Sequence, residues 1–161
     1  MSLAALQVAQ RELEAGVRGG DPARFRGPMV DAYLASVGLD AEHDGADGIG
    51  YPWCAAFVYW CSNRAGDPCP RTGSALHLWQ QSDDAHKTSL PAPGDIFVLV
   101  HHDGIHGHCG FVESCSPAGD VVTTIEGDTD AEGGTRGDAV GRHTWAPGDG
   151  KRGRLLGYIA P

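Results

Sequence analysis

The sequence predicts an α+β fold in which helices come first and an antiparallel sheet follows. Up to about residue 81, apolar side chains recur every three or four positions, which is the spacing of one helix face. From Asp95 onward, short apolar runs of strand length alternate with segments rich in glycine and proline. Helical and strand patterns that occupy separate parts of a chain are typical of α+β proteins. A chain of 161 residues has the length of one domain, so we expect a single domain over residues 1–161.

Four helices are expected before residue 82. Pro28 suits the first turn of the second helix, while Gly38 and Gly66 are suited to end the second and third. The third helix is apolar on almost every side, which predicts a helix buried within the fold. The four segments are 3–17, 28–37, 54–65, and one that follows Thr72 or Ser74 as its cap and carries Leu76, Leu78 and Trp79.

Five strands are expected after the Pro91–Gly94 break, over residues 95–100, 107–113, 120–126, 139–145 and 154–159. Pro117–Gly119 has the composition of a tight hairpin turn. If Ser116 faces Asp120, the pairing register brings His108 opposite Asp128 and Gly110 opposite Glu126, all on one face of the sheet. Either carboxylate could then reach the imidazole from the neighbouring strand. Glu126 ends an apolar strand, whereas Asp128 begins a glycine-rich surface loop and is expected to have easier access to water.

Composition and charge exclude several classes of protein. With 41% hydrophobic and 20% charged residues, the chain is expected to be globular rather than disordered. The net charge of −9 argues against a nucleic-acid partner. No apolar run approaches 18 residues and the N-terminus has no Sec signal pattern, so we expect neither a membrane span nor Sec export.

The cysteine count favours reduced thiols. Five cysteines cannot all pair within one chain, and without an export signal free thiols are the default. Cys61 lies two turns after Cys54 and is expected in the core. Cys69 and Cys115 fall near loop or strand ends and could become oxidised outside the cell.

Three residues have the chemistry of a cysteine hydrolase. Cys54 falls in the first turn of the third helix, where unpaired N–H groups and the helix dipole favour a thiolate. His108 can act as its base, and Glu126 can orient the imidazole. A cysteine followed by a histidine and a carboxylate is also the chain order of papain-like enzymes. The alternative interpretation is that Cys54 is a small buried hydrophobic residue, which is the usual role of a free cysteine.

Several segments in register resemble the CHAP family of cysteine, histidine-dependent amidohydrolases/peptidases, which are related to NlpC-type peptidases. They are Pro52-Trp-Cys-Ala-Ala-Phe-Val, Thr72-Gly-Ser-Ala-Leu, Pro93-Gly-Asp-Ile, Gly107-His-Cys-Gly-Phe-Val and Leu155-Leu-Gly-Tyr. The resemblance implies a reduced papain-like fold and bacterial peptidoglycan as substrate. It also implies catalytic roles for Cys54, His108 and Glu126. Two residues depart from the family pattern: Cys109 replaces the more frequent aliphatic residue, and Asp128 stands where asparagine is common.

The resemblance implies cleavage of the muramoyl–L-alanine amide or of a stem or cross-bridge peptide bond. Trp53 and Trp79 are candidates for the cleft wall, although large aromatic residues beside a buried helix are more often part of the core. Tyr51 is a candidate oxyanion donor. Without a Sec signal, the chain is expected to reach the cell wall after release through a holin as a phage lysin, or as a secreted antibacterial effector with an immunity protein.

Two other functions stay open at this stage. A zinc peptidase of the LAS type could hold its metal with two histidines separated by one residue and a separate His/Asp pair. A catalytically inactive wall-binding domain is the other. No cofactor is expected for the cysteine enzyme, although the acidic loop at 40–47 partly resembles a calcium site and lacks the terminal glutamate of an EF-hand loop. The candidate zinc donors are His77, Asp84, His106 and His108, whereas His101 and His102 fit a solvated hairpin loop.

Overall fold

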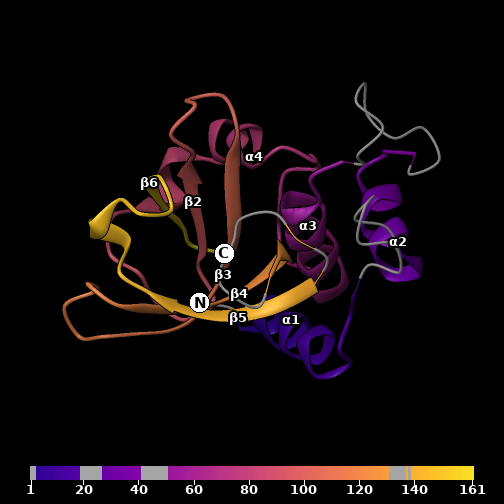
Figure 1. Cartoon of the computed structure of the whole chain (residues 1–161), viewed down its shortest axis with the longest axis horizontal. Helices are drawn as coiled ribbons and strands as arrows, with labels where there is room; N and C mark the ends of the chain where they lie inside the picture. The colour runs from indigo at the N-terminus through magenta and orange to yellow at the C-terminus, as the bar shows by residue number, and fades with distance from the viewer. Residues whose placement is uncertain (1–2, 19–26, 41–50, 131–136, 138) are drawn as a thin grey trace.

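The computed structural model describes residues 3–18, 27–40, 51–130, 137 and 139–161. Within these ranges, α-helices precede an antiparallel sheet, which confirms the α+β prediction (Figure 1). The helices are α1 (Ala4–Glu14), α2 (Pro28–Ser36), α3 (Cys54–Ala65) and α4 (Ala75–Gln81), and the short 3₁₀ turns are η1 (Asp84–His86) and η2 (Pro147–Asp149).

The helix ends follow the predicted signals. Pro28 begins α2, where its missing N–H removes no helical hydrogen bond. Gly66 ends α3 in the left-handed conformation, with φ of 76°, which is unfavourable for residues with a Cβ. Ser74 caps α4 by accepting a hydrogen bond from the backbone N–H of His77. Helix α1 is shorter than expected because it ends at Glu14, although Val17 is still buried.

All strand pairs in the sheet are antiparallel, in the order β1-β6-β2-β3-β4-β5. The sequence did not predict β1, a two-residue edge strand paired with the C-terminal strand. Two residues are too few to show a periodic pattern. The bounds are β1 Lys87–Thr88, β2 Ile96–Val100, β3 Gly107–Cys115, β4 Val122–Thr129, β5 Ala139–Trp145 and β6 Arg154–Ile159.

The β3–β4 hairpin has the predicted register away from its turn and a different one beside it. Phe111 pairs with Ile125, as expected. Nearer the turn the pairing shifts by one residue, and the backbone N–H of Ser116 bonds to Val121 rather than facing Asp120. The predicted closing pair is therefore wrong. A bulge between Val112 and Ser114 inserts the extra residue that restores the expected register beyond it.

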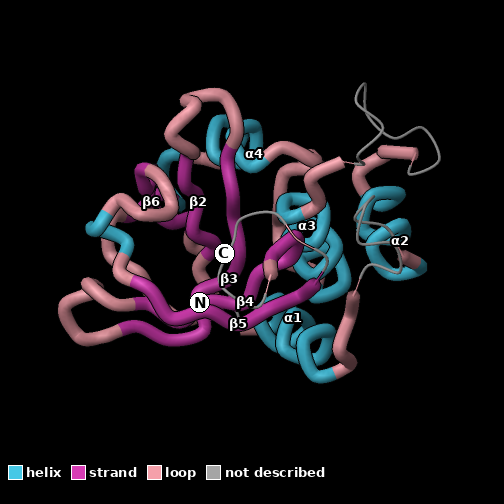
Figure 2. The backbone as a smooth tube through the Cα atoms, in the orientation of Figure 1, coloured by secondary structure: helices cyan, strands magenta, loops and turns pink. Residues whose placement is uncertain are grey.

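Apolar side chains cover both faces of the sheet. On one face, α1, α3 and α4 pack on the central strands, so that α3 lies against β3 and β4 (Figure 2). On the other face, Phe97, Leu99, Val112 and Tyr158 form a smaller cluster bordered by Trp145. Because α3 begins beside β3 and β4, its first turn meets the strands that carry His108 and Glu126.

Gly127 allows α3 to approach β4 closely. A Cβ added at this position would come within 2.7 Å of the Phe57 Cβ and 2.8 Å of the Trp53 ring. Both distances are too short for real Cβ contacts, so a larger residue would push the helix away from the strand.

Among the residues that the structure describes, no helix is both long and apolar enough to cross a membrane.

Candidate active site

Cys54 is the first residue of α3 and lines an open cleft. Helix geometry leaves the N–H groups of the first turn without intrahelical acceptors, so this end of α3 favours an anion. The thiol is only 3% exposed. A buried thiolate needs such compensation because it has lost most of its hydration.

His108 and Glu126 form a buried pair across β3 and β4. The imidazole Nε2 and a carboxylate oxygen of Glu126 are 2.7 Å apart, and neither side chain is exposed. Gly110 makes room for this pair, since a Cβ there would come within 2.9 Å of the Glu126 Cγ. The bond to Glu126 leaves Nδ1 as the nitrogen available to Cys54.

The Cys54 and His108 side chains interact without an aligned hydrogen bond. Nδ1 of His108 is buried and has no hydrogen-bond partner of normal geometry among the described residues. Even so, each of the two groups shifts the pKa of the other. Catalytic hydrogen bonds in unliganded sites are often long or poorly aligned and tighten when substrate binds. The arrangement is therefore suited to proton transfer from the thiol to the ring.

A second thiol supports the thiolate. The pKa of Cys54 lies well below its usual range because a hydrogen bond from Cys109 and the neighbouring His108 outweigh the effect of burial. Burial and the Cys54 thiolate in turn raise the pKa of Cys109 well above its usual range. Cys109 therefore stays protonated beside the Cys54 thiolate.

The His108–Glu126 pair is charged. Burial disfavours the imidazolium, but Cys54 and Glu126 raise the pKa of His108 to about 10. Burial also opposes the ionisation of Glu126, but hydrogen bonds from Arg152 and His108 lower the pKa of this carboxyl far below its ordinary value. The electrostatics thus favour three neighbouring charged groups: the Cys54 thiolate, the His108 imidazolium and the Glu126 carboxylate.

Asp128 has a different position from the one expected. It lies inside β4 rather than in a surface loop, it is 1% exposed, and its φ of 56° is in the left-handed region. Its carboxylate accepts hydrogen bonds from the backbone N–H groups of Trp53 (3.2 Å) and Gly137 (3.1 Å). The expectation that Asp128 has easy access to water is therefore wrong. Asp128 instead binds the backbone N–H of Trp53, the residue that precedes α3.

Burial and the nearby Cys54 thiolate raise the pKa of Asp128 well above its ordinary value, although its backbone hydrogen bonds act in the opposite direction. No hydrogen bond joins its carboxylate to His108 in the described part of the chain. Of the two candidate carboxylates, Glu126 is the one bonded to the imidazole.

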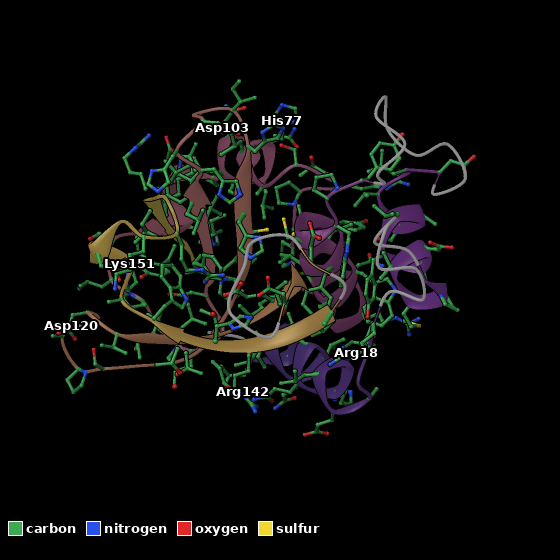
Figure 3. All side chains as sticks on the ribbon, in the orientation of Figure 1. Arg18, His77, Asp103, Asp120, Arg142 and Lys151 are labelled. Carbon is green, nitrogen blue, oxygen red and sulfur yellow. The ribbon has the colours of Figure 1, made fainter. Side chains whose placement is uncertain are left out.

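The cleft beside Cys54 has a volume of about 330 Å³. Its rim includes the β2–β3 loop, where Asp103 and His106 form an exposed pair 2.6 Å apart (Asp103 is labelled in Figure 3). Asp128 also lines this cleft. A second cleft of about 290 Å³, near the C-terminus, contains none of the candidate catalytic residues. The other lining residues are Pro52, Gly73, Ser74, Ala75, His101, Ile105 and Gly107.

The three aromatic candidates do not line this cleft. Trp53 is fully buried and stacks on Tyr33, with ring centroids 5.7 Å apart, so it belongs to the core. Tyr51 packs partly against the same core. Trp79 lies beside Gly157 of β6 and under the Lys87 ammonium. The alternative that large aromatic residues near a buried helix are core residues describes Trp53 correctly.

The candidate zinc donors are not brought together. His106 pairs with Asp103 on the surface loop, His108 is bonded to Glu126, and Asp84 pairs with Lys87. In the ranges that the structure describes, no three histidine, cysteine or acidic side chains are placed to hold a metal ion. Most of the possible calcium loop at 40–47 lies outside those ranges. All five cysteines are unpaired.

The sequence did not predict the two residues that donate hydrogen bonds to the Glu126 carboxylate. Arg152 donates to both carboxylate oxygens, at 2.8 and 2.6 Å, and the Thr124 hydroxyl donates to one of them at 2.5 Å. Nothing in the local sequence around Arg152 marks it, because its partner is 26 residues away. The position of Glu126 did indicate that such residues exist, because a carboxylate in an apolar strand requires a cationic or hydrogen-bond-donating partner.

The comparisons with known proteins agree with this geometry. The model of the CHAP domain family matches residues 46–128, which include Cys54, His108 and both candidate carboxylates. No curated protein matches the chain. The α1–α4 and six-strand arrangement is that of a reduced, papain-like CHAP fold. The chain therefore belongs to the CHAP domain family, a hydrolase family of the amidase and peptidase type.

Proposed function

We propose that the protein is a cysteine amidase or endopeptidase that cleaves an amide bond of bacterial peptidoglycan, with Cys54 as nucleophile. The observation that carries this proposal is the connected set of Cys54, His108 and Glu126 at the start of a buried helix. Of these three residues, Cys54 lines the cleft, so its sulfur is the atom that a bound substrate would reach. The family membership supports peptidoglycan as the class of substrate.

The first chemical step uses a preformed ion pair. His108 holds the proton of Cys54, and the resulting thiolate attacks the carbonyl carbon of the scissile amide. The oxyanion that develops can be stabilised by the N–H groups in the first turn of α3. Glu126 keeps the imidazole in the orientation that presents Nδ1 to the sulfur.

The second stage is hydrolysis. His108 donates its proton to the leaving amine, which departs and leaves a thioester on Cys54. The imidazole then takes a proton from water, which attacks the thioester and releases the acid product. The scissile bond is the muramoyl–L-alanine amide or a stem or cross-bridge peptide bond, and a holin or a secretion machine would deliver the enzyme to the wall. Mass spectrometry of the released fragments distinguishes the possible bonds.

Purified peptidoglycan provides the test. We expect solubilisation that iodoacetamide abolishes and that a chelator leaves unchanged, because the nucleophile is a thiolate. The control is enzyme preincubated with iodoacetamide and then freed of reagent, which should stay inactive. Inhibition by chelator with recovery on adding zinc would favour the zinc peptidase, and absence of solubilisation under all conditions would favour an inactive binding domain.

Comparison of Glu126→Gln with Asp128→Asn tests the third catalytic position. A glutamine has one acceptor oxygen in place of the two with which Glu126 binds Arg152, Thr124 and the His108 ring. We therefore expect kcat on a defined muropeptide to fall by about 10²-fold or more. Glu113→Gln is the matched control, since Glu113 forms a bidentate pair with Arg142 at the sheet surface.

Asp128→Asn should lower kcat by less than about tenfold, on the scale of one lost hydrogen bond. Asparagine keeps an acceptor for one of the two N–H groups that Asp128 binds. Thermal unfolding of each variant separates lost activity from lost fold. A near-normal Glu126→Gln enzyme with a crippled Asp128→Asn enzyme would reverse the assignment.

A further inference from the structure

Arg152 lies between η2 and β6 and reaches into the sheet to bind Glu126. Its side chain is 12% exposed, and its two terminal nitrogens contact different oxygens of the carboxylate. A bidentate pair of this kind fixes the plane of the carboxylate as well as its charge. The guanidinium therefore fixes the orientation in which the Glu126 carboxylate meets His108.

The guanidinium is itself held in place by the surrounding side chains. It lies over the ring of Trp145, 4.7 Å from the centroid. The indole N–H of Trp145 donates to the Thr124 hydroxyl, which donates to Glu126. Arg152 and Thr124 thus bind the same carboxylate that His108 contacts.

The carboxylate oxygens are fully used by these contacts. One oxygen accepts from Thr124 and Arg152, and the other pairs with His108 and Arg152. Glu126 has no exposure to water. Because burial disfavours a lone carboxylate, loss of the guanidinium would favour its protonated form. A protonated Glu126 cannot stabilise the imidazolium that holds the Cys54 proton.

We propose that Arg152 is a positioning residue for the Cys54 thiolate: it holds Glu126 ionised and oriented, and Glu126 in turn holds His108 as the imidazolium. The inference rests on the proposed roles of Cys54, His108 and Glu126. It adds a residue outside the span of the family match, which ends at residue 128.

Other titratable groups surround this chain of contacts and must be separated from it. Around Glu126 they are His108 on β3, His143 on β5, Cys109, and Arg152 itself. Around Cys54 they are His108, His101, Cys109 and Asp128. Only Arg152 among these binds Glu126 through two hydrogen bonds, so a neutral residue of similar length at position 152 tests its role selectively.

The experiment measures the alkylation rate of Cys54 by iodoacetamide between pH 3 and pH 9, which requires no peptidoglycan. Peptide mass spectrometry resolves Cys54 from the other four cysteines. The variants are Arg152→Met, Arg152→Lys, and Arg142→Met as the matched control. Arg142 forms a bidentate pair with Glu113 on the same sheet, at 2.6 and 2.8 Å, and extends outward from it (Figure 3).

We expect Arg152→Met to move the acid limit of rapid alkylation upward by about one to three pH units. The carboxyl pKa that Arg152 depresses would rise, so the charged state would be lost at higher pH. Arg152→Lys should give a smaller shift, because the charge remains but the bidentate geometry is lost. Arg142→Met should give the wild-type profile.

A wild-type profile in Arg152→Met, or an equal shift in Arg142→Met, overturns the inference. If Arg152→Met does not fold, Glu126→Gln is compared with Glu126→Gln/Arg152→Met, in which no buried carboxylate is left unpaired. Equal alkylation profiles in these two variants support action through Glu126, and a further upward shift in the double variant overturns it. Failure of the proposed function is a separate result: alkylation would still depend on Arg152 while peptidoglycan stayed intact.

Discussion

Cys54→Ser should lose hydrolysis of peptidoglycan by at least about 10⁴-fold while keeping its fold, on the scale seen when an enzyme loses its nucleophile. A serine hydroxyl is far less acidic than a thiol, so the neighbours that lower the pKa of Cys54 would not ionise it. The volume change is small, and the side chain borders a cleft. Fragment release from peptidoglycan and thermal unfolding, measured on the same preparation, check both parts.

Cys115→Ser is the matched control for this substitution. Cys115 is half-buried, and its thiol donates to the carbonyl oxygen of Pro91, a bond that a serine hydroxyl can also make. It should keep near wild-type activity. Full activity in Cys54→Ser would end the cysteine-hydrolase interpretation, whatever the result for Cys115→Ser.

His108→Ala should be as damaging as Cys54→Ser, and the double variant should be no worse than either. The two side chains act as one ion pair, so once either is lost, substitution of the other causes no further loss of rate. The imidazole is completely buried, so its loss also leaves a cavity and removes one of the partners of Glu126. Steady-state kinetics on the three variants, each checked by thermal unfolding, measure the non-additivity.

His106→Ala separates this mechanism from the zinc alternative. His106 is exposed and pairs with Asp103 on the loop beside the cleft, so its loss should have a mild effect. Additive losses from Cys54→Ser and His108→Ala would contradict the ion-pair mechanism. Equal losses in His106→Ala and His108→Ala, together with loss of bound zinc, would favour a metal enzyme.

The sequence was informative wherever a local pattern encodes structure. Apolar spacing predicted the four helices, Gly66 marked a helix end, and Ser74 was one of two candidates for a helix start. The order of Cys54, His108 and Glu126 was enough to propose a nucleophile, a base and an orienting acid, and the structure brings these three residues together. Such signals depend on residues a few positions apart or on side-chain chemistry, so they can be seen without coordinates.

The hairpin shows how far local reasoning extends. The register at Phe111 and Ile125 was predicted correctly from a closing pair that was wrong, because the bulge near Glu113 compensates for the error at the turn. A bulge depends on twist and packing across the sheet, and no residue type marks it reliably. The expectation that Asp128 lies in a solvated loop failed for a related reason, since the strand continues to Thr129 and buries it.

The sequence by itself determined the fold class, the order of the elements and the candidates for the nucleophile and base. Only the tertiary structure decided which carboxylate meets His108, that Asp128 binds the backbone N–H of Trp53 before α3, and that Arg152 and Cys109 support the charged site. These contacts join residues up to 75 positions apart. Their partners are selected by burial, because a buried charge must find a complementary group wherever the packed chain places one.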